Sequence, residues 1–168
     1  MSGTRLLLVL GAVLLTALGA QSQETVVPFG GIKLDNSLPV EIVADSLKID
    51  QAAATAEFVG SVQVAQGSMK ITADNISVKY VSDEAGATGE IESLHAIGHV
   101  TFTNGAEAAE GAEAEYLVAT GILTMTGDVL LTQGNNAMSG QSLRIDLTNG
   151  LATVEGRVQT IFQPDTNP

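Results

Sequence analysis

Four copies of one short pattern, each with a glycine near its centre, constrain this chain more than any other feature. The pattern is apolar-x-Gly-x-Val, in which x is any residue, and its copies lie at residues 58–64, 96–102, 125–131 and 154–160. A second strand-like stretch precedes each copy, at residues 44–49, 73–78, 111–116 and 140–145. The first residue of that stretch and the glycine are 16, 25, 16 and 16 residues apart. Repetition with a unit of 29 residues indicates a stack of similar strand pairs.

The second unit is nine residues longer than the others. Its extra residues fall at Ser82–Glu90, a polar, glycine-containing stretch that is typical of a turn. Further turns are predicted at 66–67, 104–105, 133–136 and 149–150, where Gly and Asn tolerate a positive φ. Whether the insertion contacts a partner or is only a longer turn is left open.

Apolar and polar residues alternate within each copy, as they do in strands that bury one face. In the first copy Phe58, Gly60 and Val62 share the apolar face, whereas Val59 and Ser61 point the other way. No helical periodicity follows residue 20. The sequence therefore predicts an all-β fold of about four 29-residue strand-pair repeats, in which short strands join their apolar faces into one elongated core.

The glycine of each copy falls on the predicted inward face and has two interpretations. It permits the strand to bend or two sheets to approach closely, which is the usual reason for a glycine inside a strand. Alternatively, it leaves space inside the fold for another molecule.

The two ends of the repeat array carry no substantial cap. Residues 25–39 are predicted to be irregular, and only six polar residues follow Phe162. An uncapped sheet edge is a template for strand addition by another chain. The sequence therefore predicts head-to-tail assembly.

The first twenty residues have the pattern of a cleavable signal peptide. Arg5 supplies the positive charge, residues 6–18 form the apolar stretch, and small residues end it at Gly19 and Ala20. The apolar stretch is shorter than the roughly twenty residues of a membrane-spanning helix, although an uncleaved anchor stays open. We therefore divide the chain into a signal peptide at 1–20, a lead-in at 21–39, a β domain at 40–163 and a short polar tail at 164–168.

Charge and composition exclude several kinds of partner and site. The chain has 7 Lys and Arg against 19 Asp and Glu, and its formal net charge is −12. It therefore has no basic stripe for a nucleic-acid backbone or an anionic membrane surface. It has no cysteine, which excludes a thiolate metal site and a cysteine nucleophile.

No arrangement of residues predicts catalysis or a metal site. His95 and His99 lie about 13 Å apart on an extended strand, too far to share one ion, and both fall on the outward face. The acidic run Glu107, Glu110, Glu113 and Glu115 lacks a calcium-loop pattern and is expected to be a solvated edge. We expect a protein that is not an enzyme and has no cofactor.

The first two units resemble the OstA-like family, which includes LptA-type periplasmic lipopolysaccharide-transport proteins. The resemblance is carried by residues 40–50 (Val-Glu-Ile-Val-Ala-Asp-Ser-Leu-Lys-Ile-Asp), 56–67 and 69–74, and it extends over about 38–162. It implies a twisted, V-shaped β-jelly roll whose apolar interior holds the acyl chains of lipid A. It also implies head-to-tail stacking between an LptC-like inner-membrane protein and an LptD-like outer-membrane protein.

The same resemblance places a lipid-binding face in this sequence. Val40 and Ile42 match apolar positions at the groove mouth of the family. The other residues expected to line the groove come from the predicted inward face: Leu47, Ile49, Phe58, Val62, Ile76, Val78, Val100, Phe102, Met125 and Leu143. Each of them equally suits ordinary core packing.

Three alternatives to a soluble lipid carrier stay open at this point. An LptC-like protein of the same fold would keep its N-terminal segment as a membrane anchor. A purely structural β-solenoid would have a dry, fully packed core. A hydrolase acting on envelope polymers would need a cleft with paired carboxylates.

Overall fold

The protein is a single antiparallel β-sheet that folds over on itself. The structure, a computed structural model, describes residues 25–28, 37–84 and 86–162, so the predicted signal peptide and tail lie outside the described residues. Its strands are β1 (Thr25–Pro28), β2 (Glu41–Val43), β3 (Ser46–Asp50), β4 (Thr55–Gln66), β5 (Met69–Asp83), β6 (Gly86–Asn104), β7 (Glu107–Leu117), β8 (Ile122–Gln133), β9 (Asn136–Asp146), β10 (Leu151–Glu155) and β11 (Gln159–Ile161). The all-β prediction is confirmed. No helix among the described residues is long and apolar enough to span a membrane.

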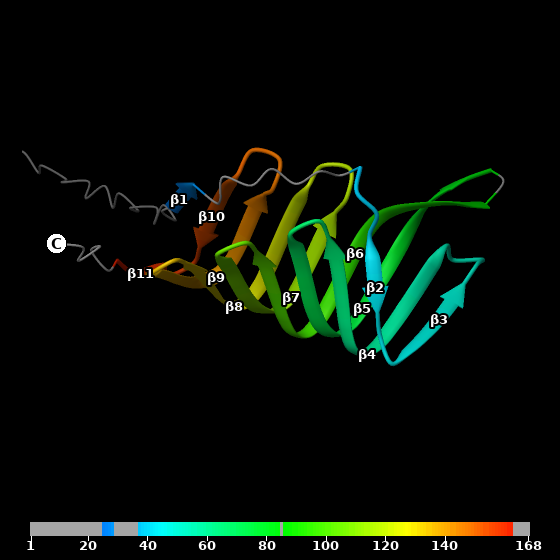
Figure 1. Cartoon of the computed structure of the whole chain (residues 1–168), viewed down its shortest axis with the longest axis horizontal. Helices are drawn as coiled ribbons and strands as arrows, with labels where there is room; N and C mark the ends of the chain where they lie inside the picture. Colours follow the sequence, from blue (N-terminus) through cyan, green and yellow to red (C-terminus); the bar gives the residue numbers. More distant parts are fainter. Residues whose placement is uncertain (1–24, 29–36, 85, 163–168) are drawn as a thin grey trace, which may run out of the picture.

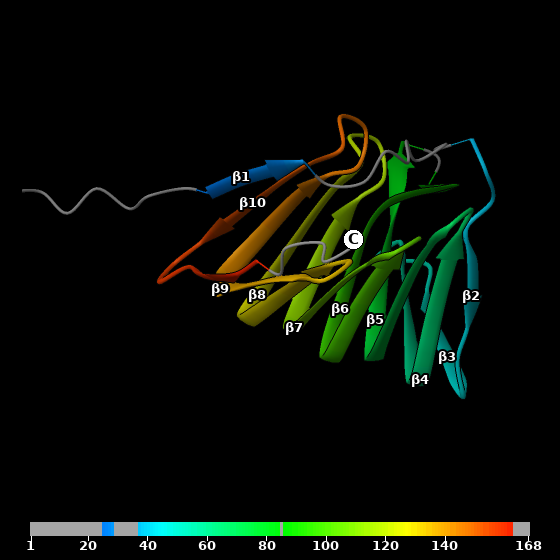
Figure 2. The ribbon, with the colours of Figure 1, turned by 60° about the vertical axis from the view of Figure 1, so that its left-hand side comes forward.

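Consecutive strands pair with each other from β4 to β10, and the sheet has the order β1-β10-β9-β8-β7-β6-β5-β4-β2. Tight turns at residues 67–68, 105–106 and 134–135 join the hairpins where the sequence predicts them. The terminal strands are split, because β2 and β3 both pair with β4, and β10 and β11 both pair with β9. β2 and β3 lie at one end of the molecule, and β1, β10 and β11 lie at the other (Figure 1, Figure 2).

The prediction of short strands is wrong, because the central strands are long and bent. β5 has 15 residues and β6 has 19, and the predicted stretch at 73–78 is only the middle of β5. Figure 1 shows these strands curving, so that each has a first and a second half. The predicted stretch of each repeat unit contains only part of this length.

A β-bulge produces the bend at Gly60, Gly98 and Gly127, and at Gly156 the strand is interrupted between β10 and β11. In the β4–β5 pair, Val59 lies opposite Asn75 and Val62 opposite Ala73, so β4 carries one extra residue between these pairs. Gly60 has φ +87° and Ser61 has φ +47°. The same pair of positive φ values recurs at Gly98 and His99, at Gly127 and Asp128, and at Gly156 and Arg157. Such bulges bend a strand and increase its twist.

The glycines do not face the interior, which corrects the predicted inward position. A Cβ at Gly60 would collide with the Asp45 side chain, and one at Gly98 would collide with Asp74. At Gly127 and Gly156 the nearest groups belong to Ala112 and Gln141. All four neighbours are exposed residues. The interpretation that the glycines permit bending is therefore confirmed. Their close contacts are with neighbouring side chains and not between two sheets, and the glycines do not form a wall of an internal groove.

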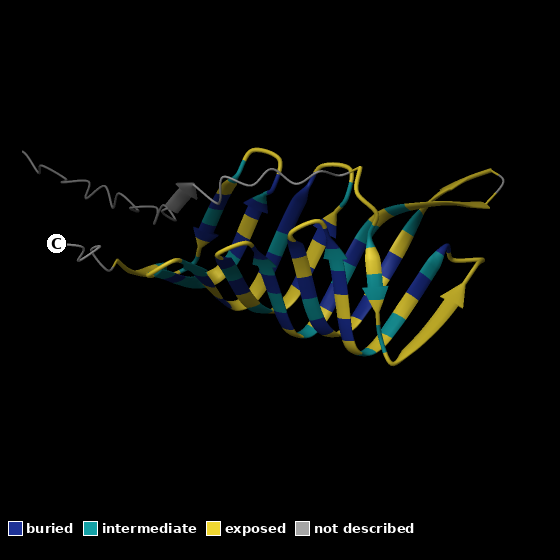
Figure 3. Ribbon diagram, viewed as in Figure 1, coloured by how far each residue is buried: buried dark blue, intermediate teal, exposed yellow. Residues whose placement is uncertain are grey.

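The bent sheet encloses one continuous apolar core. Residues on either side of each bulge face inward, and on β5 the alternation shifts so that Ala73 and Ile76 are both buried. Among the described residues, the core contains 25 buried ones, drawn from β4 to β10 and the turn after β9. Buried positions alternate with exposed ones along every long strand (Figure 3).

The nine-residue insertion extends the β5–β6 hairpin beyond the rest of the sheet. Ser82 pairs with Ala87, and Asp83 pairs with Gly86. Figure 1 shows this hairpin projecting from the body of the fold. At its base Lys79 Nζ lies 2.9 Å from Glu92 Oε1.

We expect Gly98→Ala to destabilise the fold more than Gly89→Ala. Gly89 has φ +86°, close to the +83° of Gly98, but a Cβ at Gly89 would meet nothing within 4 Å. Both substitutions therefore carry the cost of about 1 kcal/mol for a left-handed alanine. Only Gly98→Ala adds the collision with Asp74, for which we expect about 1 kcal/mol or more. Urea unfolding of the two variants measures the difference, and equal losses would contradict the close-packed bulge.

Candidate functional site

The twelve residues predicted to bind lipid lie on one face of the sheet and differ in burial. Seven have an exposed fraction of 1% or less: Val62, Ile76, Val78, Val100, Phe102, Met125 and Leu143. Three more, Val40, Ile42 and Phe58, are half-buried and pack against the core. Leu47 is 52% exposed and Ile49 is 62% exposed. The structure thus joins the twelve into one surface that becomes accessible toward β2 and β3.

The strand register arranges these residues in rows that run across the sheet. On the side of the bend where β3 pairs, one row joins Leu47, Phe58 and Ile76 and ends at Met125, Leu143 and Val154. On the other side of the bend, where β2 pairs, another row joins Ile42 to Val64, Ile71 and Phe102. Each row is a ladder of directly opposed side chains, and such pairs stabilise a sheet.

Leu47 and Ile49 are exposed because the sheet ends there. Leu47 lies opposite Phe58, and Ile49 lies opposite Ala56, so both continue inward-facing rows. Among the described strands, β3 pairs only with β4, which leaves its outer edge open. The apolar face is therefore uncovered at this end.

Sequence reasoning missed the inward-facing residues near the start of β5 and β9. Met69 and Ile71 on β5 and Met138 on β9 are all buried. The signal was the alternation Met69-Lys70-Ile71-Thr72-Ala73, which reads as a strand that begins before residue 73. The predicted stretches begin at residues 73 and 140, so they leave these three residues out.

A row of polar side chains borders the inner face at the hairpin ends. In register, Asn104 lies opposite Met69 and Glu107, and Gln133 lies opposite Glu107 and Asn136. Gln66, Asn104 and Glu107 are buried. Because Glu107 is only 6% exposed, the predicted solvated edge is wrong for this residue. Gln133 Nε2 donates a hydrogen bond of 2.8 Å to Glu107 Oε1.

Gln66 links the two halves of the sheet across the opening between them. Its Nε2 donates to the Leu38 carbonyl oxygen at 3.0 Å, and its Oε1 accepts from the Tyr116 hydroxyl at 3.3 Å. Tyr116 lies near the end of β7 on the side of the bend where β3 pairs, whereas Gln66 ends β4 on the other side. Burial raises the pKa of Tyr116 to about 12, so the phenol is a neutral donor near pH 7.

A concavity of about 590 Å³ lies beside this link, at the base of the projecting hairpin. Apolar side chains contribute much of its lining: Leu38, Val40, Val81, Ile91 and Val118. Glu90 and Glu92 stand at the same concavity. It is thus an amphipathic opening next to the Gln66 link.

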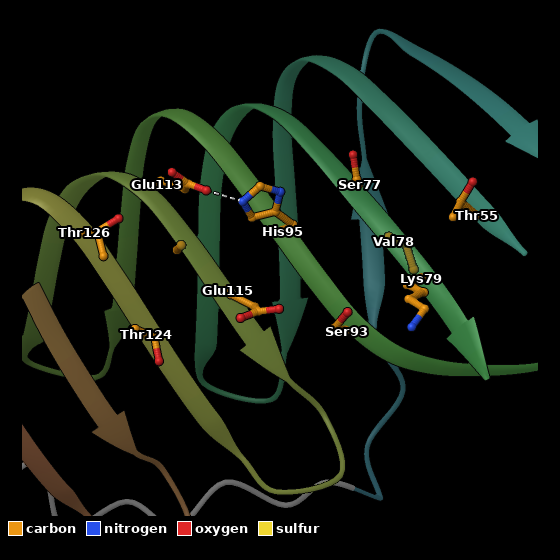
Figure 4. Close-up of a pocket in the computed structure, with 11 residues that line it drawn as sticks. Thr55, Ser77, Val78, Lys79, Ser93, His95, Glu113, Glu115, Thr124 and Thr126 are labelled. Carbon is orange, nitrogen blue, oxygen red and sulfur yellow. Dashed lines mark hydrogen bonds and ion pairs between the residues drawn. The ribbon is translucent and has the colours of Figure 1, made fainter. Parts of the chain in front are cut away.

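The outer face carries a groove of about 420 Å³ (Figure 4). Hydroxyl groups line it, including those of Ser77 and Ser93, and His95 Nε2 lies 2.5 Å from Glu113 Oε1. His99 Nδ1 lies 2.8 Å from Asp74 Oδ2 at a bulge. Both histidines point outward, as the alternation indicates. Within residues 37–84 and 86–162, no three His, Asp or Glu side chains converge as ligands of a metal ion.

Comparison with known proteins identifies the family of the chain. The sequence matches the LptA/(LptD N-terminal domain) LPS transport protein family over residues 41–151. These residues span β2 to the start of β10 and include both halves of the apolar face. The chain therefore belongs to this lipopolysaccharide-transport family.

Two relatives extend this comparison. The chain is 29% identical over 164 residues to an uncharacterized protein of Rhizobium meliloti (strain 1021), with 94% of this chain and 88% of that protein covered. In structure it resembles LptH, the LptA homologous periplasmic component of the lipopolysaccharide transport device from Pseudomonas aeruginosa. The TM-score is 0.67 at 21% identity, and the match covers 77% of this chain and 99% of LptH. The second likeness shows that the two proteins share a fold.

We expect Tyr116→Phe to remove the hydrogen bond to Gln66 and to reduce the loss of stability at alkaline pH. Loss of the bond should lower the free energy of unfolding at pH 7 by about 1 kcal/mol. An unfolded tyrosine ionises near pH 10, whereas Tyr116 ionises at about 12 in the folded protein. Between these values ionisation favours the unfolded chain, so wild-type stability should fall as pH rises.

Urea unfolding at pH 9, 10 and 11 measures this dependence. The variant should lose less stability than the wild type over the same interval, because the other tyrosine, Tyr80, is present in both. Parallel plots of unfolding free energy against pH for the two proteins would contradict a raised pKa of Tyr116 in the folded state.

Proposed function

We propose that the protein is a periplasmic lipopolysaccharide carrier that shields lipid A acyl chains in its apolar interior. The observation that carries the proposal is the continuous apolar face between the two halves of the sheet, which is covered along β4 to β9 and uncovered at β3. An exported chain would place this face between the inner and outer membranes, and the predicted signal peptide at residues 1–20 supports export.

The energetics of transfer favour this use of the interior. Each CH₂ group of an acyl chain gains about 0.8 kcal/mol when it leaves water. Leu47 and Ile49 offer a first apolar surface, and Phe58 and Ile76 continue the same row toward the buried centre. The central rows are packed in the described structure, so acyl chains that advance along them must separate the two halves of the sheet.

Polar groups at the opening suit the other end of an amphiphile. The row formed by Gln66, Asn104 and Glu107 borders the apolar face. The net charge of −12 gives the outer surface little attraction for a phosphorylated head group. We therefore place the head group in solvent beyond this row, where divalent cations neutralise its phosphates.

The two ends of the sheet support head-to-tail assembly. The exposed edge strand β3 has the sequence Ser-Leu-Lys-Ile-Asp, and residues 142–146 of β9 read Ser-Leu-Arg-Ile-Asp. The latter segment pairs with β10 inside the chain. The β3 strand of a second copy therefore has nearly the sequence that β10 already accepts as a neighbour.

Such an assembly would continue the apolar interior from one copy to the next. We propose that partners of the same fold use the same edges, namely an LptC-like protein at the inner membrane and an LptD-like protein at the outer membrane. A chain that carries lipid in this way needs no catalytic group or cofactor.

A structural scaffold is the second candidate, and one observation favours it. Val62, Ile76 and Phe102 are fully buried, as a dry core requires. The two functions differ in whether lipid reaches the inner face.

We expect a photoreactive residue at Phe58 to crosslink to lipopolysaccharide in cells, and one at Val59 to crosslink much less. The two positions are adjacent in sequence, but Phe58 faces the interior, whereas Val59 faces outward and is 39% exposed. Immunoblotting for protein-bound lipopolysaccharide after irradiation measures the ratio. Strong crosslinking at Val59 with none at Phe58 would support the scaffold and exclude the interior as the lipid site.

Depletion of the protein in its source cell should cause lipopolysaccharide to accumulate at the inner membrane. The physical reason is that acyl chains do not cross the aqueous periplasm without a shielded path. Membrane fractionation with lipopolysaccharide quantification measures the accumulation, and re-expression of the wild-type chain is the control. Unchanged distribution between the membranes would contradict the proposed transport.

A further inference from the structure

The C-terminal edge of the sheet is half covered by the chain itself. β1 pairs antiparallel with β10, with Thr25 opposite Val154 and Val27 opposite Ala152. The sequence predicts residues 25–39 to be irregular and this end to be uncapped, and β1 corrects both expectations for one half of the edge. β11 forms the other half, and among the described strands it pairs only with β9.

The repeat defines which strand of a second copy would dock at each half. Within the chain, Met125 of β8 lies between Ala114 and Leu143, which are equivalent to Leu47 in their units. By the same register, Leu47 of a second copy would lie opposite Val154 of β10. Leu131 of β8 likewise lies between Ala109 and Met138, which are equivalent to Ile42.

The second half of the edge therefore has its own predicted pair. Because Thr160 of β11 lies opposite Met138, Ile42 of a second copy would lie opposite Thr160. The two halves of the edge thus differ. β1 occupies the position beside β10 that β3 of a second copy would take, but it does not occupy the position beside β11 that β2 of that copy would take.

β1 also has the direction that the incoming strand would have. Neighbouring strands alternate in direction throughout the sheet, so a second copy's β3 would run antiparallel to β10, as β1 does. Thr25 and Val27 hold the register positions that Leu47 and Ile49 of that copy would take. β1 and the second copy cannot occupy them together.

We propose that β1 is an intramolecular edge cap that competes with β3 of a second copy for β10. The inference rests on the proposed head-to-tail assembly and adds its regulation: β11 and β2 pair first, and full pairing requires β1 to leave β10. With only four residues and a proline at its end, β1 offers a short ladder that a five-residue β3 replaces. The apparent affinity between copies is then reduced by the fraction of chains whose β10 is uncapped.

Disulfide trapping between copies tests the cap, because the chain has no cysteine of its own. One mixture combines full mature chains carrying Leu47→Cys and Val154→Cys, which report on the capped half. The matched control mixture combines Ile42→Cys and Thr160→Cys, which report on the open half. Opposed residues of antiparallel strands have Cα atoms about 4.5–5.5 Å apart, within the range of a disulfide.

Both mixtures are repeated with Val26→Pro and Val27→Pro added to every chain. The two prolines remove backbone donors from β1 and leave the sheet from β2 to β11 unchanged. Urea unfolding verifies that these chains fold cooperatively.

In the unmodified β1 background we expect the control disulfide to form at least tenfold faster than the Leu47–Val154 disulfide. The prolines should raise the ratio of Leu47–Val154 to control product at least tenfold. An unchanged ratio, with the control disulfide formed, would overturn the cap while head-to-tail assembly stands. Absence of both disulfides in both backgrounds would overturn the assembly itself, and the cap with it.

Discussion

The bend at each repeated glycine is the constraint on which the rest of the structure depends. A flat sheet of this sequence would expose one entire apolar face to water. Two consecutive positive φ values, as at Gly98 and His99, bend the strand at its middle. Since the bulges recur at the same place in neighbouring units, the bend is continuous along the sheet. The first and second halves of the strands then cover each other, and the hydrophobic effect stabilises the folded-over form.

Bending alone does not close such a sheet, because its first and last strands do not pair with each other. At β3 the apolar rows end with Leu47 and Ile49 in solvent. At the other end, the same row reaches Val154 of β10, which pairs with Thr25 of β1. The same backbone ladder therefore serves folding within a chain and, in our proposal, pairing between chains. A short cap such as β1 is a simple way to let one use compete with the other.

The apolar interior has a polar border at one side of the sheet. Apolar rows fill the space between the halves, whereas Gln66, Asn104 and Glu107 form a polar border at the hairpin ends. The bonds of Gln66 to Leu38 and Tyr116 join the two halves at the opening. In our proposal, this arrangement accommodates an amphiphile with several acyl chains. The family match covers residues 41–151, which include these polar residues and most of the apolar rows.

The sequence by itself determined the repeat, its turns, the all-β class and the inward positions around Phe58, Ile76 and Phe102, because alternation and turn chemistry are local. Only the tertiary structure decided that the predicted short strands are parts of longer, bent strands, and that the glycines lie outside the interior. Only the tertiary structure showed that Glu107 is buried and that β1 pairs with β10. These features depend on which distant strands pair and in which register, and that information is spread over the whole sheet.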